Sequence, residues 1–380
     1  MGCGGERSDA LGERTLEAHH VLVRGDGTIE LVGVARKGSI DEWCEDEGNA
    51  SEFAVARLDD SGRLAGETSI PQDRIEGCAE DLRHAAYDEE GRLVFNGSFS
   101  EWPGFLPGED GGPKQSDVVA RLRPDGSFDE SYDGDGVAVN PDETLDGVGL
   151  ARVRTPDGGV VFLEERDPYE GGVRGVLLSK VGKDGEAVRG FGSLVRGIPR
   201  ETDLTQYSIW DLALDRRRGI YGFARFLKRV ESGDLLHILF RHRLRDGKPD
   251  PAFGREGTVD ATPRGARVWS GYDFVLQPDG KPVVSGVVER GRRLRLFAAR
   301  YTAGGEVDSS FGRAGLAEFD VGRSFGDDRD WRSAVALDPE GRIVMSGFLR
   351  GRGASVFRMW PDGRVDTSFG VRGRVLVPRL

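Results

Sequence analysis

Acidic side chains at alternate positions around a glycine turn are the first feature of this sequence that could do chemistry. Asp129, Asp133 and Asp135 lie in the segment Asp-Glu-Ser-Tyr-Asp-Gly-Asp. Oxygen ligands spaced in this way can converge on Ca²⁺. An EF-hand loop starting at Asp129 would need Glu at its twelfth position, where the chain has Asn140, and no helical pattern flanks it. Two interpretations stay open: a weak Ca²⁺ site, and an ordinary turn in which aspartates accept backbone hydrogen bonds.

Cys3, Cys44 and Cys78 are the three cysteines of the chain. The start Met-Gly-Cys-Gly-Gly-Glu resembles the end of a bacterial lipoprotein signal, which implies lipidation of Cys3; the alternative is an unmodified flexible tail. With Cys3 lipidated, Cys44 and Cys78 remain, and an oxidising compartment would allow them to form a disulfide. The alternative is a pair of free, partly buried thiols.

Acidic and aromatic residues are interleaved in the first part of the chain. Residues 1–150 carry 13 basic and 34 acidic side chains, whereas the remainder carries 40 and 31. An acidic rim around aromatic groups is typical of a binding surface, and it predicts a cationic or amphipathic partner. The alternative is a set of solvated loops, and the net charge of −12 argues against nucleic acid as a partner. The predicted binding-face residues are Trp43, Glu101, Trp102, Phe105, Glu109 and Asp110.

Glycines that recur about every 60 residues identify the elements that must position these groups. Each repeat contains about four short apolar segments, and the alternation of Ser355 to Trp360 predicts half-buried antiparallel strands. We therefore predict an all-β fold, a six-bladed β-propeller with about four antiparallel strands per blade. One series of turn glycines is Gly27, Gly91, Gly158, Gly219, Gly280 and Gly341, and a second is Gly62, Gly126, Gly185, Gly247, Gly305 and Gly363. The strands predicted in the last repeat are Ser333–Leu337, Ile343–Gly347, Ala354–Trp360 and Arg374–Val377.

The repeats predict one propeller domain over residues 16–380, preceded by a flexible tether over residues 1–15. The first strand of each blade is expected to be innermost, so acidic residues near its start would line a central channel. The channel candidates are Asp81, His84, Asp211, Asp273 and Asp330. The repeats lie near 16–78, 79–147, 148–205, 206–267, 268–328 and 329–380.

A short signature recurs in the later repeats: Asp250-Pro-Ala-Phe-Gly254, Asp308-Ser-Ser-Phe-Gly312 and Asp366-Thr-Ser-Phe-Gly370. Together with Pro-Asp-Gly-Lys near residue 280, it resembles the bacterial delta-60 repeat and is similar in outline to NHL-type propeller repeats. The second repeat has the variant Asp129-Glu-Ser-Tyr-Asp133, the third keeps only Phe191-Gly192, and the first has lost the signature at Ala65–Ser69. The resemblance implies a cell-envelope or extracellular propeller and supplies no catalytic residues.

These patterns favour a non-catalytic binding or scaffold propeller, monomeric, lipid-anchored through Cys3 and located in the bacterial cell envelope or outside the cell. Its partner, a protein or another ligand, is expected on the loop face formed by residues 36–52 and 100–116. No cofactor is expected apart from the weak Ca²⁺ site. The alternative is a metal-dependent hydrolase or lactonase with a divalent ion in the central channel.

Overall fold

The computed structural model describes most of the chain between Arg14 and Val377. The described residues are 14–37, 51–70, 75, 77–88, 90–101, 115–139, 152–166, 175–182, 187–193, 195, 203–229, 234–262, 267–323, 333–349 and 353–377. In this part of the chain the regular elements are strands, and no helix is long and apolar enough to cross a membrane.

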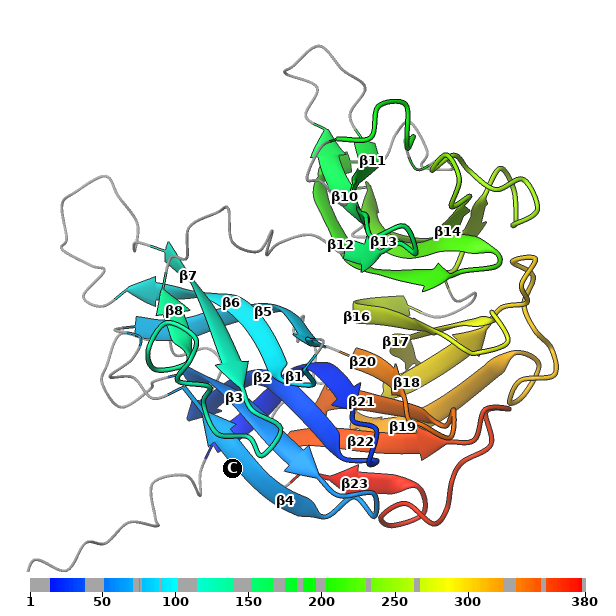
Figure 1. Ribbon diagram of the computed structural model, residues 1–380. Helices are drawn as coiled ribbons and strands as arrows, with labels where there is room; N and C mark the ends of the chain where they lie inside the picture. Colours follow the sequence, from blue (N-terminus) through cyan, green and yellow to red (C-terminus); the bar gives the residue numbers. More distant parts are fainter. Residues whose placement is uncertain are drawn as a thin grey trace, which may run out of the picture. The chain divides into compact units, whose positions relative to one another are not determined.

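The fold is an all-β propeller built from antiparallel sheets, which we number along the chain (Figure 1). Contacts divide it into two compact units; the first contains sheets 1, 2 and 6, and the second contains sheets 3, 4 and 5 together with the turn Trp360–Arg364.

Each sheet of the first unit is a four-stranded meander. Sheet 1 contains β1 (Arg14–Val23), β2 (Ile29–Lys37), β3 (Ser51–Leu58) and β4 (Leu64–Ser69). Sheet 2 contains β5 (Gly77–Tyr87), β6 (Leu93–Glu101), β7 (Gln115–Leu122) and β8 (Val137–Val139). Sheet 6 contains β20 (Ser333–Leu337), β21 (Ile343–Leu349), β22 (Gly353–Met359) and β23 (Arg374–Leu376).

The second unit has two four-stranded meanders and one sheet with three described strands. Sheet 3 contains β9 (Arg152–Arg154), β10 (Val160–Arg166) and β11 (Gly175–Val181). Sheet 4 contains β12 (Asp203–Asp215), β13 (Gly219–Arg229), β14 (Asp234–His242) and β15 (Thr258–Asp260). Sheet 5 contains β16 (Arg267–Leu276), β17 (Pro282–Arg290), β18 (Arg293–Arg300) and β19 (Leu316–Arg323).

The prediction of about four antiparallel strands per blade is therefore confirmed, but the described residues form five four-stranded blades rather than the six predicted. In sheet 3 three strands are described, and its repeat retains only Phe191-Gly192 of the signature. The segment after these residues adds no described strand to the sheet, although Ser193 still accepts a backbone hydrogen bond from Leu178.

The turn glycines adopt the conformation that the repeat requires. Gly62 has φ of +85°, and a Cβ there would lie 2.3 Å from Cγ2 of Val375 in sheet 6. Asp59 closes the same turn, because its Oδ1 accepts hydrogen bonds from the backbone NH groups of Ser61 and Arg63. The recurrent glycines thus mark tight turns between strands, as the sequence indicated.

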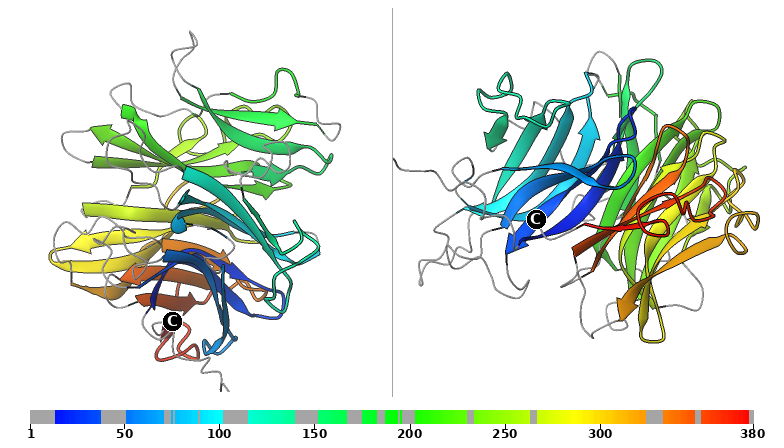
Figure 2. Two further views of the ribbon diagram at one scale, coloured as in Figure 1. Left: turned by 90° about the vertical axis from the view of Figure 1, so that its left-hand side faces the viewer. Right: turned by 90° about the horizontal axis from the view of Figure 1, so that it is seen from below.

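The core lies between the sheets, so both faces of an inner strand are covered. One cluster joins β1–β3 to sheet 6 through Leu16, Leu31 and Val356, and the opposite face of sheet 1 packs on sheet 2 through Val32 and Phe95. Figure 2 shows the strands of sheets 1 and 6, blue and orange to red, side by side. The predicted half-buried alternation of residues 355–359 is therefore wrong: these positions are 3% exposed or less on both faces, because a neighbouring sheet covers what the pattern assigned to solvent.

Candidate functional site

An arginine on the third strand of a sheet holds the signature aspartate in four of the sheets. In sheet 6, Arg358 Nε lies 2.7 Å from Asp366 Oδ2, and the two residues are 3% and 1% exposed. A guanidinium in this position is a permanent charge whose donors are fixed in a plane. The equivalent pairs are Arg121–Asp129 at 2.8 Å, Arg241–Asp250 at 2.8 Å and Arg300–Asp308 at 2.9 Å.

The aromatic residue of the signature stacks against the same guanidinium. The carbon at the centre of the Arg358 guanidinium lies 4.6 Å from the centroid of the Phe369 ring. Such cation–π contacts strengthen when they are removed from water. The corresponding distances are 4.7 Å for Arg121 on Tyr132, 5.0 Å for Arg241 on Phe253 and 4.8 Å for Arg300 on Phe311.

A second cation reaches three of the signature aspartates from the start of the second strand. Arg342 Nη1 lies 3.7 Å from Asp366 Oδ2, Lys281 Nζ lies 3.0 Å from Asp308 Oδ2, and Arg92 Nη1 lies 3.3 Å from Asp129 Oδ2. The serine two residues after each aspartate donates from its hydroxyl to Oδ1, at 2.5 Å for Ser368 and 2.6 Å for Ser310. Each carboxylate is thus surrounded by donors.

These donors lower the pKa of three signature aspartates, Asp129, Asp308 and Asp366. The hydrogen bond from Ser310 has the largest effect on the pKa of Asp308, and Lys281 and Arg300 lower it further against the opposing effect of burial. Burial alone would raise the pKa of Asp366, but hydrogen bonds from Ser368 and Arg358 more than offset it. The aspartates are therefore held ionised, and they are poorly suited to proton transfer near neutral pH.

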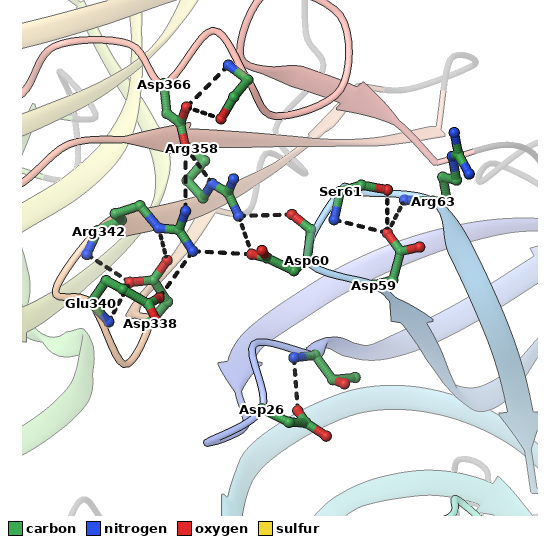
Figure 3. Close-up of polar contacts among 12 residues, drawn as sticks. Asp26, Asp59, Asp60, Ser61, Arg63, Asp338, Glu340, Arg342, Arg358 and Asp366 are labelled. Carbon is green, nitrogen blue, oxygen red and sulfur yellow. Dashed lines mark hydrogen bonds and ion pairs between the residues drawn. The ribbon is translucent and has the colours of Figure 1, made fainter.

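The arginine also binds the backbone of a turn in the neighbouring repeat. Arg241 Nη1 donates to the carbonyl of Ala303 at 2.5 Å, and Arg300 Nη1 donates to the carbonyl of Pro361 at 2.7 Å. In sheet 6, Arg358 Nη1 donates to the carbonyl of Asp60 in sheet 1 at 2.8 Å (Figure 3). The repeated unit of arginine, aspartate and aromatic ring, which we call the arginine latch, therefore ties a repeat to the turn of another repeat.

Sheet 1 has lost the signature, and Glu30 supplies the missing carboxylate from a different strand. Glu30 is 1% exposed and pairs directly with Arg57 across β2 and β3, with Oε1 3.3 Å from Arg57 Nε. It also binds Arg24 at 3.0 Å and accepts a hydrogen bond from the hydroxyl of Tyr87 in sheet 2 at 2.8 Å. Burial raises the pKa of Tyr87 and the negative charge of Glu30 raises it further, so Tyr87 remains a hydrogen-bond donor. Arg57 Nη1 still donates to the carbonyl of Asp125 in sheet 2 at 3.2 Å.

The predicted Ca²⁺ ligands have other roles in the structure. Asp129 is a latch aspartate, paired with Arg121 and Arg92. Asp133 has φ of +50° in the turn, and Asp135 Oδ1 accepts the backbone NH of Val137 at 2.9 Å. This geometry favours the turn interpretation. Within the described residues, no three His, Cys, Asp or Glu side chains are grouped to hold a metal ion.

Four of the five channel candidates lie in first strands, and the structure describes the side chain of only one of them. The backbones of Asp81, His84 and Asp211 lie in β5 and β12, opposite Ser98, Asn96 and Phe223 respectively. Asp273 lies in β16 opposite Ser285 and accepts a hydrogen bond from the backbone NH of Phe274 at 2.8 Å. Asp330 lies outside the described residues.

The predicted binding face falls mostly outside the described part of the chain. This applies to Trp43, Trp102, Phe105, Glu109 and Asp110, and only the backbone of Glu101 is described, at the end of β6. Cys78 is disulfide-bonded and 7% exposed. Cys3 and Cys44 lie outside the described residues, so the pairing of Cys44 with Cys78 stays a prediction.

The sequence interpretation missed the latch arginines, although a signal was present. Arg121, Arg300 and Arg358 each precede the signature aspartate by eight residues, and Arg241 precedes it by nine. The half-buried alternation predicted for Ser355 to Trp360 makes Arg358 a polar position of a half-exposed strand. A spacing of eight or nine residues between arginine and aspartate in four repeats distinguishes this arginine from an ordinary surface residue.

Comparisons with known proteins agree with this fold. A family model described as a domain of unknown function (DUF5122) beta-propeller matches residues 277–311, the segment that contains Arg300 and Asp308. No curated protein matches the sequence.

Among solved structures, the chain is similar to AofleA from Arthrobotrys oligospora, with 9% identity over 97% of this chain and 92% of that chain and a TM-score of 0.46. It is also similar to the intramolecular trans-sialidase from Ruminococcus gnavus, with 11% identity over 90% and 91% of the two chains and a TM-score of 0.44. The endo-arabinase from Bacteroides thetaiotaomicron shares 13% identity over 93% and 97%, with a TM-score of 0.37. These similarities carry no functional argument.

Proposed function

We propose that this chain is a non-catalytic binding or scaffold propeller of the delta-60 type, with sheet 3 as the third of six blades. One observation carries the proposal: the charged residues that recur in the repeats are paired with one another. Arg358, for example, donates hydrogen bonds to Asp366 and Asp60, and its guanidinium plane stacks on the ring of Phe369. Repetition here builds a rigid support rather than a set of reactive groups.

The partner would bind the loop face formed by residues 36–52 and 100–116, and we propose that it is cationic or amphipathic. The support is the excess of acidic side chains in residues 1–150, together with Trp102 and Phe105. An envelope or extracellular location with a lipid anchor at Cys3 fits the resemblance of the first residues to a lipoprotein signal, and we propose a monomer.

A binding experiment with a defined probe tests this assignment. We expect a cationic amphipathic peptide of lysine and leucine to bind the protein, and the double variant Trp102→Ala, Phe105→Ala to bind it more weakly while melting at nearly the parent temperature. The loss should be larger at low than at high salt, because charge attraction at the rim is screened. Trp360→Ala is the matched control, since Trp360 is 41% exposed but lies in a turn outside the loop face.

Two results would contradict the proposal. If the double variant melts well below the parent, the two rings are packed core and the site is elsewhere. If the purified protein carries a stoichiometric divalent ion whose removal by EDTA lowers the melting temperature strongly, the hydrolase alternative is favoured instead.

A further inference from the structure

Sheets 1 and 6 are packed neighbours although they stand at opposite ends of the chain. β4 ends at Ser69 and β20 begins at Ser333, so no short connection holds them together, whereas sheets 1 and 2 follow each other directly in the sequence. Their contact depends on a shared apolar cluster that includes Leu16, Ala334 and Val356, and on polar contacts near the turn 59–63. We call this contact the closing seam.

Asp60 in that turn carries a carboxylate that the equivalent residues of other repeats lack. Asp60 stands two residues before the turn glycine Gly62. The same position in other repeats holds Pro124, Arg245, Ala303 or Pro361, and none of these has a carboxylate. Wherever a latch arginine reaches this position, it binds the backbone carbonyl there. Among the described latches, only the one at the closing seam also binds a side-chain carboxylate, that of Asp60.

The added carboxylate binds two arginines of sheet 6. Asp60 Oδ1 accepts hydrogen bonds from Arg358 Nη1 at 2.6 Å and from Arg342 Nη2 at 3.0 Å (Figure 3). The two guanidinium groups are only 4% and 12% exposed, whereas the Asp60 side chain is 58% exposed. Their attraction to Asp60 therefore acts at the surface, where salt weakens it.

The other charged groups at the seam are engaged within their own sheets. Asp338 and Glu340 bind Arg342 at 2.5 and 3.0 Å, and Asp366 binds Arg358. In sheet 1, Asp59 accepts hydrogen bonds from Ser61 and Arg63. Among these carboxylates, Asp60 is the one that joins the two sheets by ion pairs.

We propose that Asp60 is a charged strap that closes the seam between the last and the first sheet, so that this seam opens ahead of the rest of the fold when the strap is neutralised or screened. A seam without a short covalent connection relies on noncovalent contacts alone, and local opening in proteins follows such weak boundaries. The proposal does not depend on the binding function proposed above.

Hydrogen exchange of the full chain, followed by mass spectrometry, tests the strap. In Asp60→Asn we expect amides of β1 and β20 to exchange roughly two- to fivefold faster than in the parent, the range that follows from losing an ion pair with a partly exposed partner. The parent at 0.5 M salt should show the same regional acceleration relative to 0.05 M. Peptides from β17 and β18 should exchange at unchanged rates in both experiments.

Asp362→Asn is the matched control. Asp362 also lies in a turn of the same series, but it pairs with exposed Arg364 rather than with a latch arginine. We expect it to leave exchange in β1 and β20 unchanged. The proposal is overturned if neither Asp60→Asn nor added salt changes the exchange rates of β1 and β20, or if exchange accelerates equally in every sheet.

Discussion

Arg358 and Asp366 show how much of this fold depends on single charged residues. The pair is nearly inaccessible, and Arg358 is surrounded by groups that match its charge and its flat shape. When one member of such a pair is lost, the other remains as a buried charge without compensation.

We therefore expect Asp366→Asn to lower the free energy of unfolding by about 3 kcal/mol. Asp362→Asn, which removes the charge from the exposed pair with Arg364, should cost less than about 1 kcal/mol. Chemical denaturation of the two variants and the parent measures the difference. Equal effects would show that the latch contributes no more than a surface ion pair.

The latch aspartates also predict how stability depends on pH. The pKa values of Asp129, Asp308 and Asp366 are lowered in the folded state relative to about 3.9 in the unfolded chain, so the folded protein holds fewer protons at these residues. The stabilisation is complete above that value and is lost as the pH falls through the folded pKa values. We expect the melting temperature to be flat between about pH 7 and pH 5 and to fall below about pH 4.

Asp308→Asn cannot take part in this titration, so its melting temperature should be lower at neutral pH and fall less steeply in acid. Melting curves recorded across the pH series compare the two slopes. If the melting temperature of Asp308→Asn falls as steeply in acid as that of the parent, the titration of Asp308 does not contribute to the acid sensitivity.

At the scale of the strand and the turn, one slot in the signature demands a left-handed backbone. Gly254, Gly312 and Gly370 have φ between +50° and +52°, and Asp133 adopts +50° in the same slot of sheet 2. A side chain is disfavoured there, although aspartate is tolerated better than most residues.

Asp133→Gly should therefore raise the melting temperature, with a gain of up to about 1 kcal/mol in stability. Gly312→Ala is the opposite change and should destabilise the fold, because its Cβ would lie 2.4 Å from the carbonyl oxygen of Leu316. Differential scanning calorimetry with and without Ca²⁺ decides between the two interpretations of this turn. If Ca²⁺ raises the melting temperature of the parent but not that of Asp133→Gly, the Ca²⁺ interpretation of this turn is favoured instead.

A second prediction at this scale concerns Glu30, which supplies from β2 the carboxylate that the lost signature of sheet 1 would have provided. Glu30→Gln should lower the free energy of unfolding by about 3 kcal/mol, since Arg24 and Arg57 would lose their shared carboxylate. Glu30→Val combined with Arg57→Leu should recover part of that loss, since the cross-strand partner of the latch arginine is Val344 in sheet 6. A double-mutant cycle by urea denaturation measures the recovery, and strictly additive losses would contradict the pairing.

The positions of the strands were more predictable from the sequence than the burial and the partners of their side chains. Turn glycines and apolar runs placed β20 and β23 to within a residue or two, because these signals are local. The burial of Arg358 and the replacement of a signature aspartate by Glu30 were not predictable in the same way, since both depend on which sheet covers which face. Sequence periodicity reports an alternation of faces, but it does not say that the second face is also covered.

At the scale of the whole molecule, the all-β propeller was predicted correctly, whereas the described residues form five four-stranded blades rather than the six predicted. The sequence also gave no account of the contacts between sheets, which join residues as far apart as Asp60 and Arg358.

The remaining prediction at this scale concerns the covalent link at Cys78. Non-reducing mass analysis after oxidative expression should find Cys44 joined to Cys78, and the Cys78→Ser variant should lose roughly 3–4 kcal/mol, the value expected for closing a loop of 34 residues. Two free thiols would contradict the pairing, and a peptide joining Cys3 to Cys78 would contradict both the pairing and the lipidation of Cys3.

The direction of the arginine latches has a consequence for synthesis on the ribosome. Arg57, Arg241 and Arg300 each reach forward to a turn that is translated later, whereas Arg358 reaches back to Asp60, 298 residues earlier. At typical translation rates, the first sheet waits roughly 15–60 s before its partner emerges. Throughout that interval the nascent chain presents the Leu16 and Leu31 face of sheet 1 without sheet 6 to cover it, so a chaperone that shields apolar strands would act on the beginning of this protein rather than on its end.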